Sequence, residues 1–251
     1  MNKKLALIAL MVIATAVLAQ DGPETLKDSR DGQIYSISTL HPFSNLVWME
    51  QNLNYGTPVE GERLKLGRGQ KYCYDDDLKN CRKYGGLYTW EAAKQSCPDG
   101  WRLPTEKDWN NLEQEYLMGV TALCGPGMPS SFGDSAAIER MFCHGRRWTS
   151  FEGTEEFFDV VGTMMKTEAW GGFVSENAYG FLPGGIRGVA GTQVEFLGKG
   201  SHGMWWTSSR AGGDSVNVRV LLRKSGKLEY WLALKGIGAS VRCVKEQKEK
   251  K

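Results

Sequence analysis

The chain of 251 residues has little histidine and almost no charge imbalance, and each shortage excludes a class of function. Three histidines leave acid–base catalysis by imidazole, and histidine ligation of a metal, little to draw on. Thirty-one lysines and arginines stand against 29 aspartates and glutamates, a formal net charge of +2. That balance provides no basic surface for nucleic acid, so we expect no nucleic-acid partner.

Motifs that mark catalytic or metal sites are also missing. GxSxG is absent, and the adjacent pair Ser201-His202 lies on a glycine-flanked stretch that makes no base-activated nucleophile. No CxxC pair occurs to hold a metal. The acidic run at residues 75–77 lacks the spaced ligands, glycine and closing glutamate of a helix–loop–helix calcium site. We expect a solvated acidic loop there, no enzyme activity, no metal and no cofactor.

The one long apolar run is at the N-terminus, and it is too short to span a bilayer comfortably. Lys3 and Lys4 precede the run, which covers residues 5–14, and small residues lead to Ala19. This pattern is typical of a secretory signal peptide, residues 1–19, cleaved after Ala19. We expect an exported protein, in the periplasm, at the cell surface or outside the cell, without a membrane span.

Export changes the interpretation of the six cysteines, because an even count in an oxidising compartment favours disulfides over a metal site. Sequence alone permits fifteen full pairings. Cys73 and Cys81 bracket a short acidic segment, and a local disulfide that closes this loop is the simplest arrangement. The others are Cys97, Cys124, Cys143 and Cys243.

The composition favours one loop-rich domain with an aromatic core, given 31 glycines and nine tryptophans. Residues 20–30 are polar and aperiodic, which predicts a linker. The domain is expected over residues 31–245, and the charged tail, residues 246–251, is expected to fray.

Residues 97–109, CPDGWRLPTEKDW, predict a structural corner between two helices. The first helix is expected over residues 87–95 and ends because Pro98 cannot continue its hydrogen bonding. Thr105 is a good N-cap for the second helix, and Asp108 lies where a reciprocal capping carboxylate would lie. An apolar stripe at helical spacing follows: Trp109, Leu112, Tyr116 and Leu117.

Alternation and turn signals predict strands elsewhere in the chain. Two are expected over residues 31–40 and 46–55. Residues 118–203 are the least regular part, with short helical pieces expected near 130–142 and 154–165. Strand edges are expected after these pieces, at 181–188 and 204–210. A closing antiparallel set is expected over residues 215–224, 227–235 and 238–245.

Six motifs in one order carry a resemblance to a known family: VWMEQNL (47–53), YGGLYTWEAA (84–93), CPDGWRLPTEKDW, GFLPGG (180–185), WWTSS (205–209) and SVRCVK (240–245). Together they resemble the Fibrobacter succinogenes major paralogous domain, a family of secreted and surface proteins. The resemblance implies a C-type-lectin-like α+β fold with two helices, a twisted antiparallel sheet and a long glycine-rich loop region. It also implies that Cys97 pairs with Cys243, which leaves Cys124 and Cys143 as the third pair.

The family resemblance implies a fold more firmly than an activity. Calcium-dependent sugar sites in lectin-like folds resemble Glu-Pro-Asn or Gln-Pro-Asp followed by Trp-Asn-Asp, and these tripeptides are absent. Formylglycine-generating enzymes have a related fold and use reactive cysteines with copper, for which a reduced Cys124 or Cys143 is the nearest candidate. An even cysteine count in an exported chain favours structural pairing instead.

Aromatic side chains are the remaining candidates for binding, since sugar C–H faces stack on aromatic rings. Trp148, Trp170 and Tyr179 lie in the glycine-rich region, and Trp205 points opposite to Trp206 if both lie on one strand. We expect these four candidates to form a solvent-facing platform, with core packing as the alternative. The leading hypothesis is a secreted or surface-associated, non-catalytic module that binds a polysaccharide or surface protein. The alternatives are a structural subunit of a surface assembly and an enzyme of the formylglycine-generating type, and the oligomeric state stays open.

Overall fold

The structure is a computed structural model that describes residues 24–39, 45–60, 70–124, 161–172, 180–190 and 193–247, with side chains omitted at 118–124 and 189–193. The expected signal peptide, the helical piece at residues 130–142, Cys143, Trp148 and Tyr179 lie outside these residues. Of the piece expected at residues 154–165, the described part, residues 161–165, is helical.

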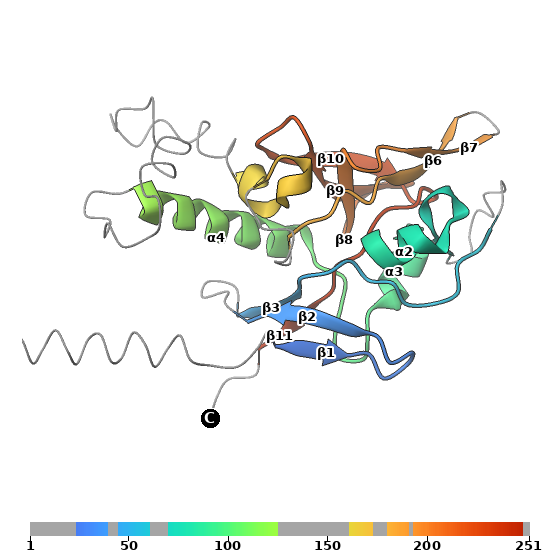
Figure 1. Cartoon of the computed structure of the whole chain (residues 1–251), viewed down its shortest axis with the longest axis horizontal. Helices are drawn as coiled ribbons and strands as arrows, with labels where there is room; N and C mark the ends of the chain where they lie inside the picture. Colours follow the sequence, from blue (N-terminus) through green and yellow to red (C-terminus); the bar gives the residue numbers. More distant parts are fainter. Residues whose placement is uncertain are drawn as a thin grey trace, which may run out of the picture.

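The architecture is α+β, as expected, with several antiparallel sheets and few helices (Figure 1). A four-stranded sheet has the order β1 (Thr25–Lys27), β2 (Ile34–Ser38), β3 (Leu46–Met49), β11 (Val244–Glu246). A three-stranded sheet has the order β10 (Leu228–Leu234), β9 (Ser215–Leu222), β8 (His202–Gly212). Two small pairs are β4 (Lys71–Tyr72) with β5 (Leu87–Tyr88), and β6 (Ile186–Ala190) with β7 (Gln193–Leu197).

The last strand of the chain does not close the sheet in which we expected it. β9 and β10 pair as predicted, but β11 pairs with β3, with Val244 opposite Trp48. The preceding segment runs beside β8, where Ser240 bridges Trp205 in parallel, before it reaches β3. The C-terminal segment therefore links the two sheets, an arrangement that local strand signals do not specify.

The labelled helices are α2 (Leu78–Tyr84), α3 (Trp90–Ser96) and α4 (Glu106–Cys124), beside the helical residues 161–165 and short 3₁₀ turns at Tyr74–Asp76 and Glu168–Trp170. The acidic segment at residues 75–77 is solvated as expected at Asp75 and Asp77, which are exposed, but it is more ordered than a loop, because it ends a 3₁₀ turn and then caps α2. The Asp77 carboxylate accepts a hydrogen bond from the Lys79 backbone N–H at 2.8 Å and so caps the helix. No helix in the described ranges is long and apolar enough to cross a membrane.

The corner at residues 97–109 forms between two helices as predicted, but the first helix begins at Trp90 and not at residue 87, because Leu87 and Tyr88 pair with β4 as strand β5. The Thr105 hydroxyl accepts from the Asp108 backbone N–H at 3.1 Å, and the Asp108 carboxylate accepts from the Thr105 N–H at 2.6 Å. Arg102 donates to the same carboxylate at 2.6 Å. Burial opposes ionisation of Asp108, but these donors outweigh it and lower the pKa of the carboxyl. Below the cap, Trp109 is fully buried, as the apolar stripe predicts.

Two disulfides are present among the described cysteines, and both match the expected pairings. Cys73 bonds Cys81, eight residues away, and Cys97 bonds Cys243, 146 residues away. The long-range bond joins the end of α3 to the segment before β11. It therefore closes most of the domain into one loop.

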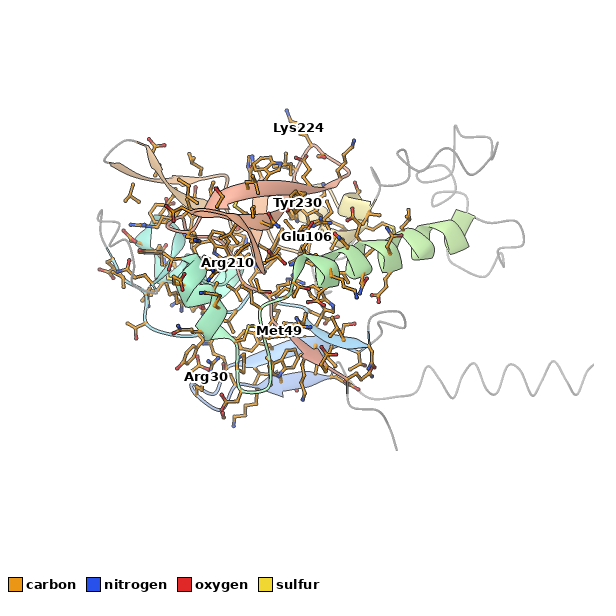
Figure 2. All side chains as sticks on the ribbon, turned by 180° about the vertical axis from the view of Figure 1, so that it is seen from behind. Arg30, Met49, Glu106, Arg210, Lys224 and Tyr230 are labelled. Atoms are coloured by element: carbon orange, nitrogen blue, oxygen red, sulfur yellow. A yellow bond between two sulfur atoms is a disulfide. The ribbon has the colours of Figure 1, made fainter. Side chains whose placement is uncertain are left out.

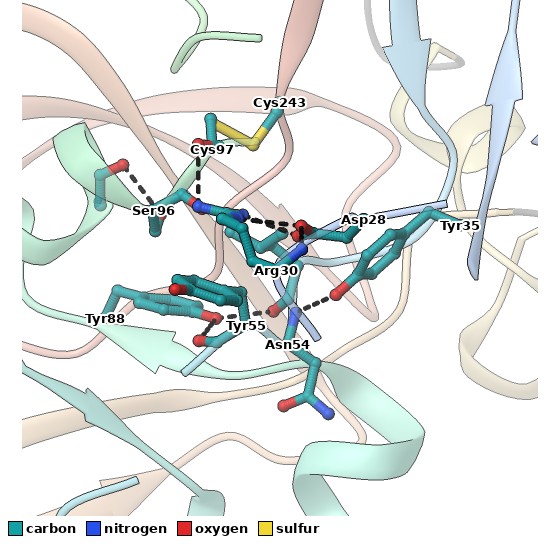
Figure 3. Close-up of a disulfide and its surroundings, with 11 residues drawn as sticks. Asp28, Arg30, Tyr35, Asn54, Tyr55, Tyr88, Ser96, Cys97 and Cys243 are labelled. Carbon is teal, nitrogen blue, oxygen red and sulfur yellow. Dashed lines mark hydrogen bonds and ion pairs between the residues drawn. A yellow bond between two sulfur atoms is a disulfide. The ribbon is translucent and has the colours of Figure 1, made fainter. Parts of the chain in front are cut away.

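The N-terminal segment belongs to the fold, so the linker predicted at residues 20–30 is wrong for its second half. β1 pairs with β2, and Arg30 then binds the buried carboxylate of Asp28 at 2.7 Å (Figure 3). The same guanidinium donates to the carbonyl oxygens of Ser96 at 2.9 Å and Cys97 at 3.1 Å. Its face lies 3.6 Å from the ring centre of Tyr55. Arg30 thus ties the first hairpin to the end of α3 beside the disulfide.

The sheet β8–β10 separates two apolar clusters, because its side chains alternate between its faces. One cluster contains Trp206 and Val218, and the other contains Trp205, Trp109 and Trp170. α4 packs on the second face. Both faces of β8 are therefore covered at its centre.

Candidate functional site

Two members of the predicted aromatic platform lie in the core, so core packing, the alternative, holds for them. Trp170 and Trp205 are each 0 % exposed. The Trp170 indole donates to the Phe181 carbonyl oxygen at 2.8 Å, and the Trp205 indole donates to the Asn52 side-chain oxygen at 2.8 Å. Trp205 and Trp206 point to opposite faces of β8, but both faces are covered, so neither ring is exposed. Trp148 and Tyr179 lie outside the described residues.

The exposed aromatic residues of the described structure lie instead on β10, which the sequence interpretation treated only as a strand. Tyr230 is 43 % exposed, Trp231 39 %, and Leu232 and Leu234 each 62 %. β10 is an edge strand among the described strands, since its sheet has the order β10-β9-β8. The missed signal is the sequence LEYWLAL, where large apolar residues follow one another without the polar alternation of a half-buried strand.

Tyr230 shares its sheet face with polar residues of β9 and α4. Tyr230 is opposite Arg219, and Leu232 is opposite Asn217, so all four side chains emerge on the face that α4 covers. We call this region the α4–β10 surface and define it by Glu106, Asn110, Glu113, Asn217, Arg219, Tyr230 and Leu232.

Glu106, at the start of α4, is the centre of this surface. One carboxylate oxygen, Oε2, accepts from the Asn217 amide at 2.9 Å and from the Tyr230 hydroxyl at 3.4 Å. Figure 2 shows Glu106 and Tyr230 next to each other on the ribbon. Partial burial, and then the neighbouring Glu106 carboxylate, raise the pKa of Tyr230, which keeps the phenol a hydrogen-bond donor. The other oxygen, Oε1, has no hydrogen-bond partner within the described part of the chain.

Arg219 forms the floor of the α4–β10 surface and is only 4 % exposed. Its guanidinium forms an ion pair with Glu113 and donates to the Asn110 side-chain oxygen at 3.3 Å. Arg219 Nε and Asn217 Oδ1 are buried and lack hydrogen-bond partners among the described residues. A buried polar atom without a partner costs about 1–3 kcal/mol, so both atoms favour a ligand or ordered water here.

The two carboxylates that α4 contributes to the α4–β10 surface differ from the paired carboxylates of glycoside hydrolases. Glu106 and Glu113 are seven residues apart on one helix, about 10.5 Å along its axis. Paired carboxylates of glycoside hydrolases are closer, at roughly 5–9.5 Å, and Glu113 is already bound to Arg219. At Ser201, the hydroxyl lies 2.8 Å from His202 Nδ1, but no described carboxylate orients the ring. The described residues contain no group of His, Cys, Asp and Glu that could hold a metal.

Comparison with curated proteins finds no match, and comparison with solved structures finds none either. The family model of the Fibrobacter succinogenes major domain matches residues 43–245. The matched region runs from just before β3 to the middle of β11 and includes both disulfides and the whole α4–β10 surface. It covers most of the chain and contains all six sequence motifs. The chain therefore belongs to the Fibrobacter succinogenes major domain family.

Proposed function

We propose that this protein is an exported, non-catalytic module that binds a glycan at the α4–β10 surface. The observation that carries the proposal is an exposed tyrosine ring beside a carboxylate, Glu106, of which one oxygen has no hydrogen-bond partner among the described residues. A sugar ring offers a C–H face for Tyr230 and a hydroxyl donor for Glu106 Oε1. These are the groups that glycan sites combine.

The rigidity of the surface supports this proposal. Glu106 is held by the Asn217 amide, and its backbone N–H donates to the Ser209 hydroxyl at 3.0 Å. Arg219 is held by two residues of α4. Preorganised polar groups lose less conformational entropy when a ligand binds.

The finer fold assignment belongs to the same proposal: we take the α+β architecture to be C-type-lectin-like. Three features support it: strands from both ends of the chain share one sheet, helices flank the corner, and a disulfide joins α3 to the segment before β11. The absence of the calcium-site tripeptides fits a sugar site built without calcium on α4 and β10.

The second candidate is a structural subunit of a surface assembly. The apolar edge strand β10 favours it, because exposed apolar edges commonly pair with another chain. An enzyme of the formylglycine-generating type needs reactive cysteines, and the candidates, Cys124 and Cys143, have side chains outside the described residues.

A glycan array followed by pull-down on insoluble cellulose and xylan tests the proposal. The mature protein should bind at least one polysaccharide, and Glu106→Gln should weaken that binding roughly ten-fold, because it removes the charged acceptor. Glu91→Gln is the matched control, since Glu91 forms an exposed pair with Lys94 on α3, away from the surface. The proposal is wrong if no glycan binds, or if both variants bind like the parent.

A further inference from the structure

The outer edge of β10 has features of a pairing surface that the glycan proposal does not use. The pairing with β9 is unbroken from Leu228 to Leu234, and no other described strand pairs with the opposite edge of β10. Lys235 follows directly, and its backbone N–H donates to the Asp214 carbonyl oxygen at 3.1 Å. Backbone groups alternate between the two edges of a strand, so odd-numbered residues of β10 face β9. Leu228, Tyr230, Leu232 and Leu234 therefore direct their N–H and C=O groups outward.

This alternation limits how two copies of β10 can pair. In an antiparallel pair, two opposed residues either both direct their backbone N–H and C=O groups toward the partner strand or both direct them away. Neighbouring residues of one strand differ in this direction, so they cannot oppose each other, and a two-fold axis has to pass through a residue and not between two residues. An axis through Trp231 would place Lys227 opposite the second copy's Lys235, which repels. An axis through Leu232 instead places Glu229 opposite Lys235, twice.

The register centred on Leu232 is complementary at every position. The opposed pairs are Glu229 with Lys235, Tyr230 with Leu234, Trp231 with Ala233, and Leu232 with its own copy. The largest side chain meets the smallest. Lys235 brings a positive charge opposite Glu229, although its ammonium also donates to the Gly213 carbonyl oxygen of its own chain at 2.7 Å and lies 3.8 Å from the Asp214 carboxylate. Glu229 is already fixed at the edge, because its carboxylate accepts from the Trp231 indole at 2.8 Å. Cross-strand pairs of these kinds stabilise sheets.

We propose that the protein forms a two-fold homodimer in which the β10 strands of two copies pair antiparallel about Leu232. The three-stranded sheets then become one six-stranded sheet, and Leu232 and Leu234 are covered. The outward groups of Tyr230 and Leu232 exchange backbone hydrogen bonds with the second copy. Leu234 supplies its N–H and the second lone pair of its carbonyl oxygen, which already accepts from the Ile237 N–H at 3.2 Å. This inference does not depend on glycan binding.

A charge exchange tests the interface, with mass measured by sedimentation equilibrium over a range of concentrations. The average mass of the mature protein should rise with concentration from that of one chain towards twice that value. Glu229→Lys places two lysines together at both ends of the interface, and Lys235→Glu places two glutamates together. Each single variant should raise the dimer dissociation constant roughly ten-fold.

Two rescues separate pairing from misfolding. The double variant Glu229→Lys/Lys235→Glu restores both opposite-charge pairs and should restore the dimer. An equimolar mixture of the two single variants should form a heterodimer, because each supplies the charge that the other lacks. Glu229 and Lys235 of one chain are six residues apart, about 20 Å along the strand, so no contact within one chain explains such rescue. A monomer at every concentration, a dimer that both single variants leave unchanged, or failure of both rescues overturns the proposal.

Discussion

Removing the long-range disulfide should destabilise the domain about twice as much as removing the local one. The Cys97–Cys243 bond closes a loop of 146 residues and the Cys73–Cys81 bond one of eight. The chain-entropy relation gives about 5 kcal/mol for the first loop and about 2.5 kcal/mol for the second.

Urea unfolding followed by tryptophan fluorescence measures both losses. The variants are Cys97→Ala/Cys243→Ala and the matched control Cys73→Ala/Cys81→Ala, each of which removes both partners and leaves no new free thiol. Because domains are typically stable by about 5–15 kcal/mol, the first variant should keep about 0–10 kcal/mol and the control about 2.5–12.5 kcal/mol, so the first variant should unfold at a clearly lower urea concentration than the control. Equal losses, or a larger loss in the control, would refute the reasoning from loop length.

Two further predictions concern buried groups. Trp170→Ala and Trp205→Ala should each lower the free energy of unfolding by roughly 3–5 kcal/mol in calorimetry, as truncation of fully buried tryptophans does; a melting temperature close to the parent's would place these rings outside the core. Thr105→Ala should lose about 1 kcal/mol of stability at pH 7. Asp108→Ala should lower the free energy of unfolding at pH 7. Because the pKa of Asp108 is lowered in the folded protein, the ionised carboxylate is the form that stabilises, so the difference in free energy of unfolding between variant and parent should shrink as the pH falls below 3.8, the ordinary pKa of an aspartate. A difference in stability that does not change with pH would contradict this.

The corner was predictable from the sequence because its determinants are local. Thr105 and Asp108 are three residues apart, and Pro98 acts on its immediate neighbours. The local disulfide was predictable for the same reason. The Cys97–Cys243 pair needed the family resemblance, since spacing alone does not select one pairing out of fifteen.

The candidate site was not predictable from local patterns, because it depends on what covers each strand. Alternation predicts that one of Trp205 and Trp206 points into the core and the other to solvent. In the structure α4 covers one face of their sheet, and the apolar cluster that contains Trp206 and Val218 covers the other. Trp231 lies in a similar apolar run and is exposed, because β10 is an edge strand. Strand order is a tertiary property, and the position of β11 beside β3 shows the same limit.

The most direct test of the α4–β10 surface compares the two adjacent aromatic residues of β10. Tyr230 and Trp231 have similar exposed fractions, 43 % and 39 %, but they lie on opposite faces of the strand. Calorimetric titration with a soluble oligosaccharide from the best-bound glycan measures affinity per chain, and thermal scans of the same samples measure stability. Tyr230→Ala should lose about 1–3 kcal/mol of binding free energy, by analogy with stacking of nucleic-acid bases on aromatic rings, with little change in melting temperature. Trp231→Ala should keep the parent affinity. Equal affinity in both variants, or a loss confined to Trp231→Ala, would contradict a glycan site at the α4–β10 surface.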